Sequence, residues 1–196
     1  TPLAEKIKKR IIDIAKNYDI TIIEVGGTVG DYEAAIFLEA IRQLRNELSP
    51  NDTLLIHVVW VPFIGILGEY KTKPAQQSFR FLLESGLVID SIIARTEIEG
   101  ISPQAKNKLS LYSNVPPEAI FEVPNLETPY ETLLLLYEQG IHRIILRRFG
   151  LSPRKRPEDL LKKWRDFISR LKNASYKIRV GLVGKYTRMM LSLVHI

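Results

Sequence analysis

The sequence predicts an α/β fold in which a mostly parallel β-sheet is covered by helices. Short apolar runs typical of strands alternate along the 196-residue chain with segments whose apolar residues recur at helical spacing. The strand-like runs are continuously apolar, which is typical of parallel strands buried on both faces. A chain of this length can also bury one sizeable core.

The predicted elements follow one another from the N-terminus. Ile7, Ile11 and Ile14 predict a first helix within residues 3–15, with lysines and arginines on its other face. Apolar runs predict strands at 20–24, 53–61, 88–94, 119–122 and 141–146. Helical spacing predicts helices between them at 34–47, 76–85, 103–112 and 128–139.

The composition changes after residue 146. Arginines and Lys155 crowd around Pro153 and Pro157, which indicates an exposed connector. Pro157, Glu158 and Asp159 then predict the start of a helix that runs to Lys172, because proline and carboxylates both suit a first helical turn. A last apolar run at 178–186 predicts one more strand. We therefore expect three parts, bounded as 1–150, 151–175 and 176–196.

Composition narrows the classes of function. The chain has no cysteine, which excludes disulfides and thiolate zinc sites, and its three histidines lack metal-ligand spacing. We expect no membrane contact and a cytoplasmic location, because no segment approaches a membrane span and the N-terminus lacks a signal-peptide pattern. The net charge of +6 suits anionic partners. No nucleic-acid-binding motif is present, so we expect nucleotides instead of nucleic acid.

A glycine-rich turn after the predicted strand at 20–24 is the first candidate site. The strand ends at Glu24, and the turn contains Gly26, Gly27 and Gly30 before the carboxylate of Asp31. In parallel α/β sheets, ligands bind outside the carboxyl ends of the strands, and a carboxylate there can hold Mg²⁺. The residues alone leave two interpretations of Glu24: a metal ligand, or a strand-end side chain that caps a turn.

A second candidate site is the basic segment from Lys71 to Gln76. Two lysines flank the hydroxyl of Thr72, directly before a helix that begins near Pro74. This arrangement suits phosphate oxygens, although a solvated basic loop would have the same composition.

Three sequence blocks carry a resemblance to a known family. They read EVGGTVGDYE from Glu24, GEYKTKPAQQS from Gly68 and KLSLYSNVP from Lys108. In this order they resemble the signatures of CTP synthases, and the resemblance runs from about residue 21 to 186. It implies a P-loop-NTPase-like, dethiobiotin-synthetase-like fold. It also implies a two-step reaction, in which ATP phosphorylates the 4-oxygen of UTP and ammonia from glutamine then replaces the phosphate to give CTP.

The resemblance also assigns site residues. Glu24 is expected to bind Mg²⁺, with ATP as cosubstrate. The UTP and CTP site is expected to contain Asp31, Tyr32, Glu33, Lys71, Thr72, Lys73, Pro74, Ala75, Gln76 and Lys108. The adenine end of the ATP site is expected to contain Arg95, Pro124, Asn125 and Leu126. The sequence departs from the family pattern at three positions: Tyr32 replaces Ile, Ala75 replaces Thr and Gln77 replaces His.

The same resemblance divides the chain into part of a synthetase domain, a basic linker with a helix, and the start of a glutamine amidotransferase domain. It places the P-loop and a second metal-binding aspartate upstream of Thr1. Gly184 and Lys185 do not substitute for that loop, because Tyr186 follows instead of Ser or Thr. With no cysteine nucleophile either, we expect the 196-residue chain alone to be inactive.

Two other functions remain open at this point. The chain can be a non-catalytic nucleotide-binding or oligomerisation module, since the family assembles as dimers and tetramers. It can also be a nucleotide-binding relative with another substrate, such as an ATP-dependent carboxylase or amide ligase of the same fold.

Overall fold

The computed structural model describes residues 1–32, 34–153, 157–176, 178–179 and 181. Contacts divide the chain into two compact units, Thr1–Arg156 and Pro157–Ile196. The predicted strand at 178–186 lies almost entirely outside the described residues.

A parallel three-stranded sheet forms the centre of the first unit, in the order β1-β4-β5. Its strands are β1 (Ile56–Trp60), β4 (Ser91–Arg95) and β5 (Ile120–Val123). The register pairs Val58 with Ile93, and Ala94 with Glu122. A second, antiparallel pair consists of β2 (Phe63–Ile64) and β3 (Glu69–Tyr70).

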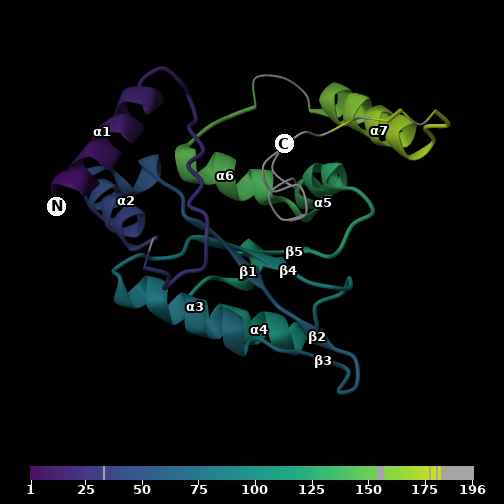
Figure 1. Cartoon of the computed structure of the whole chain (residues 1–196), viewed down its shortest axis with the longest axis horizontal. Helices are drawn as coiled ribbons and strands as arrows, with labels where there is room; N and C mark the ends of the chain where they lie inside the picture. Colours follow the sequence, from purple (N-terminus) through teal and green to yellow (C-terminus); the bar gives the residue numbers. More distant parts are fainter. Residues whose placement is uncertain (33, 154–156, 177, 180, 182–196) are drawn as a thin grey trace. The chain divides into compact units, whose positions relative to one another are not determined.

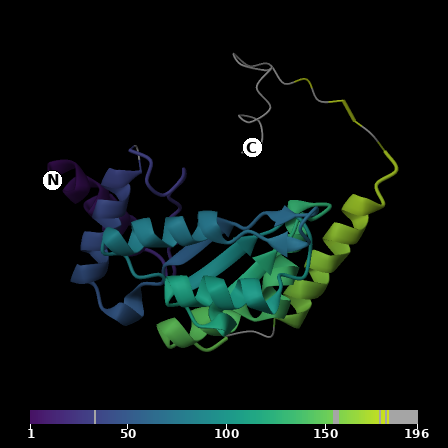
Figure 2. The same ribbon diagram turned by 90° about the horizontal axis from the view of Figure 1, so that it is seen from below.

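Helices cover both faces of this sheet (Figures 1 and 2). One face carries α3 (Lys73–Glu84) and α4 (Pro103–Ser113), which also pack against each other. The other carries α5 (Thr132–Gln139), which contacts β5, and α6 (Ile141–Phe149). This arrangement confirms the predicted parallel sheet covered by helices.

The main core lies between the sheet and the α3–α4 layer. Phe79 of α3 and Leu109 of α4 are completely buried, and Ile92 of β4 lies with them in the same cluster. The α4 helix ends at Asn114, whose φ of 60° is left-handed, a conformation that asparagine tolerates. Asn114, which begins the NVP segment of the third sequence block, is therefore the C-cap of α4.

The remaining elements of the first unit surround this framework. Helices α1 (Pro2–Ala15) and α2 (Ala35–Glu47) pack together, and the buried Lys8 of α1 forms ion pairs with Glu5 and Glu47. Short 3-10 turns are η1 (Pro50–Asp52), η2 (Pro117–Ala119) and η3 (Pro129–Glu131).

A charged cluster joins α2, α6 and the start of β4. Asp90 accepts hydrogen bonds from the Arg45 guanidinium at 2.8 Å and the Leu55 backbone N–H at 2.7 Å. Arg148 of α6 forms a second close ion pair with the same carboxylate. The Asp90 side chain is only 12% exposed. One carboxylate therefore compensates two arginines from different helices.

The second unit contains α7 (Glu158–Lys172), which confirms the helix predicted after Pro157. Glu158 and Asp159 occupy its first turn, and Arg170 and Lys172 occupy its last, as the helix dipole favours. Its rings of Trp164 and Phe167 are 5.6 Å apart.

Two predicted strands are wrong. Residues 20–24 form no strand, and Ile22 is 91% exposed, because no described strand offers this segment a hydrogen-bonding partner. Residues 141–146 lie in α6 instead. Gly140, with a φ of 92°, ends α5 and allows a second helix to begin at once. In α6 the exposed positions are Arg143 and Arg147, four residues apart, which is a helical period.

No helix within the described residues combines the length and apolar character needed to cross a membrane.

Candidate functional site

The carboxyl ends of β1, β4 and β5 gather the chain segments that carry most of the candidate residues. Two hydrogen bonds align these ends: the Val61 N–H donates to the Arg95 carbonyl at 2.8 Å, and the Thr96 N–H donates to the Val123 carbonyl at 3.1 Å. In parallel α/β folds this is the edge where ligands bind.

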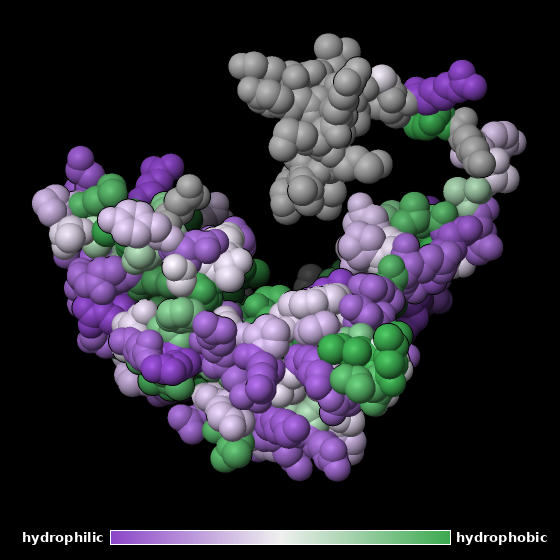
Figure 3. Space-filling view, turned by 60° about the horizontal axis from the view of Figure 1, so that its bottom comes forward, coloured by the Kyte–Doolittle hydropathy of each residue, from purple (hydrophilic) through white to green (hydrophobic). Residues whose placement is uncertain are grey.

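The β2–β3 hairpin returns the chain to this edge. The Lys71 N–H donates to the Pro62 carbonyl at 2.9 Å, so Lys71 lies directly beside the end of β1. The hairpin tip is apolar, with Ile66 almost fully exposed, and Figure 3 shows a hydrophobic patch on the side of the molecule where the hairpin lies. The hairpin was absent from the sequence prediction because each of its strands has only two residues.

Lys71 already has a carboxylate partner, Glu69, with which it forms a close ion pair. The Lys71 ammonium holds the pKa of Glu69 below its ordinary value, and Lys108 of α4 lowers the pKa of Glu69 further through its charge. The structure thus brings Lys71 and Lys108, from two separate sequence blocks, around one carboxylate. The sequence interpretation missed Glu69, although residues two apart in a strand share a face.

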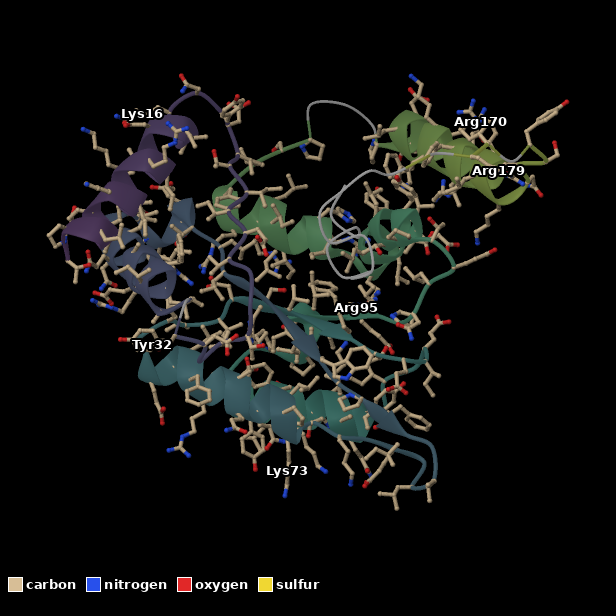
Figure 4. The ribbon with its side chains drawn as sticks, viewed as in Figure 1. Lys16, Tyr32, Lys73, Arg95, Arg170 and Arg179 are labelled. Carbon is tan, nitrogen blue, oxygen red and sulfur yellow. The ribbon has the colours of Figure 1, made fainter. Side chains whose placement is uncertain are left out.

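The other residues of this block lie at the start of α3. Thr72 and Ala75 are buried, and the Gln76 side-chain amide donates to the Thr72 hydroxyl at 2.8 Å. Lys73 and Pro74 are exposed, and Lys73 lies on the outer side of the α3–α4 layer (Figure 4). Within this block, Lys71 therefore lies at the sheet edge and Lys73 faces solvent. Thr72 and Gln76 form a hydrogen bond with each other.

The predicted adenine-end residues do come together. Arg95 ends β4, and its guanidinium donates to the carbonyls of Val123 at 3.0 Å and Pro124 at 2.8 Å. It also donates to the side-chain oxygen of Asn125 at 3.4 Å. Leu126 follows as a half-buried residue. These contacts fix the guanidinium across the ends of β4 and β5 (Figure 4).

The glycine-rich turn forms a separate hollow of about 300 Å³, lined by Glu24, Val25, Gly26, Gly27, Asp31, Ala34 and Phe37. Asp31 accepts a hydrogen bond from the Thr28 N–H at 3.0 Å, which fixes the turn. Gly27 and Gly30 have φ values of 91° and 103°, so side chains are disfavoured there. Tyr32 is 97% exposed, and Glu33 lies outside the described residues.

This hollow lies apart from the lysines. A Cβ atom at Gly30 would be 3.5 Å from the Phe81 ring, so the turn packs near the end of α3. Phe81 is about 12 Å along the helix axis from Lys73. Figure 4 likewise shows Tyr32 and Lys73 in different regions. The structure therefore does not bring Glu24 together with Lys71.

The donor set of the hollow fits a hard cation such as Mg²⁺. Glu24 is exposed, and its carboxylate lies over Gly26, where a Cβ atom would be 3.3 Å from the carboxylate oxygen. Asp31 lies at the neighbouring glycine, where a Cβ atom on Gly27 would be 3.7 Å from its carboxylate oxygen. Mg²⁺ characteristically uses one or two carboxylates and fills its other positions with water or phosphate oxygens. Among the described residues, no group of three or more histidine, aspartate or glutamate side chains is arranged so that it could hold a metal ion.

His57 of β1 is a structural residue. Its Nε2 lies 2.7 Å from the Ser78 hydroxyl, and its ring packs edge-on against Phe79. Burial lowers the pKa of His57 to about 4. The folded protein therefore holds a neutral imidazole under α3.

We expect acid to destabilise the fold through His57. The ordinary pKa of 6.5 falls to about 4 in the folded state, so the unfolded chain binds more protons between these values. Stability should be complete above pH 6.5 and decline by roughly 2–3 kcal/mol as the pH falls towards 4. Urea denaturation across this range measures the decline. His57→Asn keeps a polar partner for Ser78 but cannot titrate, so its pH dependence should be flatter. Parallel curves for the two proteins would contradict this role.

The fold and the side chains at this edge of the sheet define a class of protein. It is a parallel α/β protein with cationic and amide side chains at the carboxyl ends of its strands. Comparison with known proteins makes the assignment specific. The sequence profile of the CTP synthase N-terminus matches residues 2–151. The chain therefore belongs to the CTP synthase family.

Individual relatives agree with this assignment. The chain is 43% identical to the CTP synthase of Aquifex aeolicus over 187 residues, which are 95% of this chain and 34% of that protein. Identity is 42% with the CTP synthase of Pyrobaculum calidifontis and 40% with that of Thermococcus gammatolerans, each with the same coverage. The chain thus spans about a third of the length of these curated relatives.

Proposed function

We propose that the chain serves in the ATP-dependent amination of UTP to CTP, with nitrogen from glutamine or ammonia, in pyrimidine nucleotide biosynthesis. One observation carries this proposal. Lys71 and Lys108 converge at a strand edge from two different family blocks, and Arg95 and Asn125 converge at the neighbouring strand ends. Family membership supports the choice of UTP and ATP over the substrates of an ATP-dependent carboxylase or another amide ligase.

In this reaction the residues of the edge bind and position charged groups. Lys71 and Lys108 offset the charge of the pyrimidine triphosphate at this edge. Lys73, which faces solvent in the structure, is proposed to join them, while Thr72, Pro74, Ala75 and Gln76 shape the turn that carries Lys71 and Lys73. Arg95, Pro124, Asn125 and Leu126 hold the adenine end of ATP. Positioning and charge stabilisation are the main contributions a protein makes to phosphoryl transfer. The chemistry that Mg²⁺ supplies when bound is neutralisation of charge on the transferring phosphoryl group.

The metal and pyrimidine contacts of the glycine-rich turn are part of the same proposal. Glu24 is the proposed Mg²⁺ ligand, and Asp31, Tyr32 and Glu33 are the proposed contacts to UTP or the product CTP. The hollow holding Glu24 lies away from Lys71, so joint action of these residues requires the turn to move relative to α3.

We further propose that residues 1–150 are part of a P-loop-NTPase-like synthetase domain, followed by a linker and the beginning of an amidotransferase domain. Dimers or tetramers are the proposed assembly. The 196-residue chain by itself is proposed to be inactive, because its sequence contains neither a cysteine nucleophile nor a P-loop motif. The protein is proposed to act in the cytoplasm.

A non-catalytic nucleotide-binding or oligomerisation module is the second candidate function. The exposed apolar tip of the β2–β3 hairpin favours it, since Ile66 and Leu67 offer a contact surface without catalytic groups.

Lys71→Ala tests the proposed pyrimidine site. We expect this substitution to weaken binding of UTP or CTP to the 196-residue chain by about 1.5–3 kcal/mol, the usual worth of a hydrogen bond to a charged group. Isothermal titration calorimetry measures the change. Lys71 must break its ion pair with Glu69 before it can bind a phosphate group. We therefore expect a loss of binding free energy in the lower part of this range.

A matched control is Lys106→Ala, which removes a lysine of α4 only two positions from Lys108. If charge alone does not determine binding, the nucleotide affinity of Lys106→Ala should stay within twofold of the wild-type affinity, which is about 0.4 kcal/mol of binding free energy. Equal losses for Lys71→Ala and Lys106→Ala would indicate nonspecific attraction and remove Lys71 from the site.

A further inference from the structure

Trp60, the last residue of β1, lies on the face of the sheet opposite α3. His57 and Val59 point toward α3, since His57 contacts Ser78 and Phe79 and Val59 belongs to the core beneath that helix. Side chains alternate along a strand, so Val58 and Trp60 point to the other face. Both are exposed there, Val58 by 58% and Trp60 by 45%.

Arg95 is the neighbour of Trp60 on that face. The parallel register pairs Trp60 with Arg95, and adjacent strands lie about 4.8 Å apart. Ile92 and Ala94 are buried in the α3–α4 core, so Ile93 and Arg95 share the face of Val58 and Trp60. The Trp60 side chain therefore lies beside the stem of Arg95, whose guanidinium extends from β4 toward the end of β5.

The hydrogen bonds of Arg95 give this pair a polar border. Its guanidinium is held by the carbonyls of Val123 and Pro124 and by the Asn125 side-chain oxygen. Because that oxygen accepts from Arg95, the exposed Asn125 side chain presents its amide nitrogen as the remaining donor group. A flat apolar surface bordered by a fixed cation and an amide suits a planar heterocycle with hydrogen-bonding edges.

The two faces of the sheet separate this position from the pyrimidine lysines. Lys108 belongs to α4, on the α3–α4 face, and Lys71 is its neighbour at Glu69. Trp60 lies on the opposite face, where α5 contacts β5 and where Val58 and Trp60 of β1 are exposed. A purine has a larger stacking surface than a pyrimidine, so adenine fits this position better than uracil.

We propose that the adenine base of ATP stacks on the indole of Trp60, with its edge toward Arg95 and Asn125. Trp60 is then a specificity-determining residue for the purine. This inference rests on the proposed binding of ATP, and it adds a residue from β1 to contacts that otherwise come from β4 and the segment after β5.

The two tryptophans of the chain make the test direct. In an ¹⁵N-labelled protein each gives one indole N–H signal, and Trp164→Phe identifies which one belongs to Trp60. We expect ATP to shift the Trp60 signal with saturation, since stacking places it in the ring current of adenine. Inorganic triphosphate, which has the charge but no base, should leave it in place.

A substitution gives the size of the effect. Trp60→Leu should raise the Kd for ATP about tenfold or more, as expected for loss of a base–aromatic stack. The affinity is read from the backbone signal of Asn125, so the variant needs no tryptophan reporter. Trp164→Leu is the matched control and should leave the Kd unchanged. The wild-type titration stays decisive even if Trp60→Leu does not fold.

The outcomes separate this inference from the proposed function. If ATP shifts the Asn125 signal but not the Trp60 indole, ATP binding stands and the stacking role is overturned. If UTP shifts the indole as strongly as ATP, the assignment to adenine is overturned. If ATP moves no signal at millimolar concentration, the ATP site itself fails, and Trp60 with it.

Discussion

Replacing Asp90 by alanine is expected to lower the free energy of unfolding by about 3–5 kcal/mol, the typical cost of breaking a buried ion pair by removing one partner. Asp90 compensates Arg45 and Arg148 together, and their side chains are only 16% and 26% exposed. Its carboxylate also accepts from the Leu55 N–H at 2.7 Å. The variant leaves two partly buried guanidinium groups and one backbone donor without this acceptor.

Urea denaturation followed by circular dichroism measures this loss. Asp52→Ala, at an exposed aspartate of η1, is the control and should change stability by no more than about 0.5 kcal/mol. Asp90→Asn keeps the size of the side chain and one acceptor oxygen, so we expect a smaller loss than with alanine. A loss below about 1 kcal/mol for Asp90→Ala would show that the cluster relaxes into solvent, as exposed ion pairs do.

The sequence predicted the sheet well where apolar runs are buried on both sides. β1, β4 and β5 were each predicted within three residues of their observed ends, and the helices α1 to α5 were found as well. The prediction failed where a similarly apolar run forms a helix instead of a buried strand. Residues 141–146 are apolar enough for a strand, but Gly140 terminates α5 and the exposed arginines repeat with a helical period.

The candidate site was predictable in part for a geometrical reason. Carboxyl ends of neighbouring parallel strands must meet at one edge, so the approach of Arg95 to Asn125 follows from correct strand assignments. The position of Glu24 did not follow, because it depended on a strand at 20–24 that the structure does not contain. The ion pairs of Asp90 were also beyond prediction, since they join segments 45 and 58 residues apart in sequence.

Glu24→Gln is expected to remove the metal site of the glycine-rich turn while leaving the fold intact. Glutamine keeps the shape of the side chain but loses the charge that a hard cation requires. Changes to groups that only orient a metal ligand already cost 10–100-fold in affinity, so loss of the ligand itself should cost about 100-fold or more. Asp31 alone should not compensate, because one of its oxygens is engaged by the Thr28 N–H.

Mn²⁺, a paramagnetic substitute for Mg²⁺, reports on this site without any requirement for turnover. In the wild-type chain, with UTP present, we expect it to broaden the amide signals of Gly26 and Gly27, which line the hollow with Glu24. In Glu24→Gln these signals should stay sharp at the same Mn²⁺ concentration. Glu99→Gln, at an exposed glutamate after β4, controls for general loss of negative charge. Equal broadening in wild type and Glu24→Gln would place the metal elsewhere. Broadening that disappears in both variants would mean that net charge, and not the Glu24 carboxylate, attracts the ion.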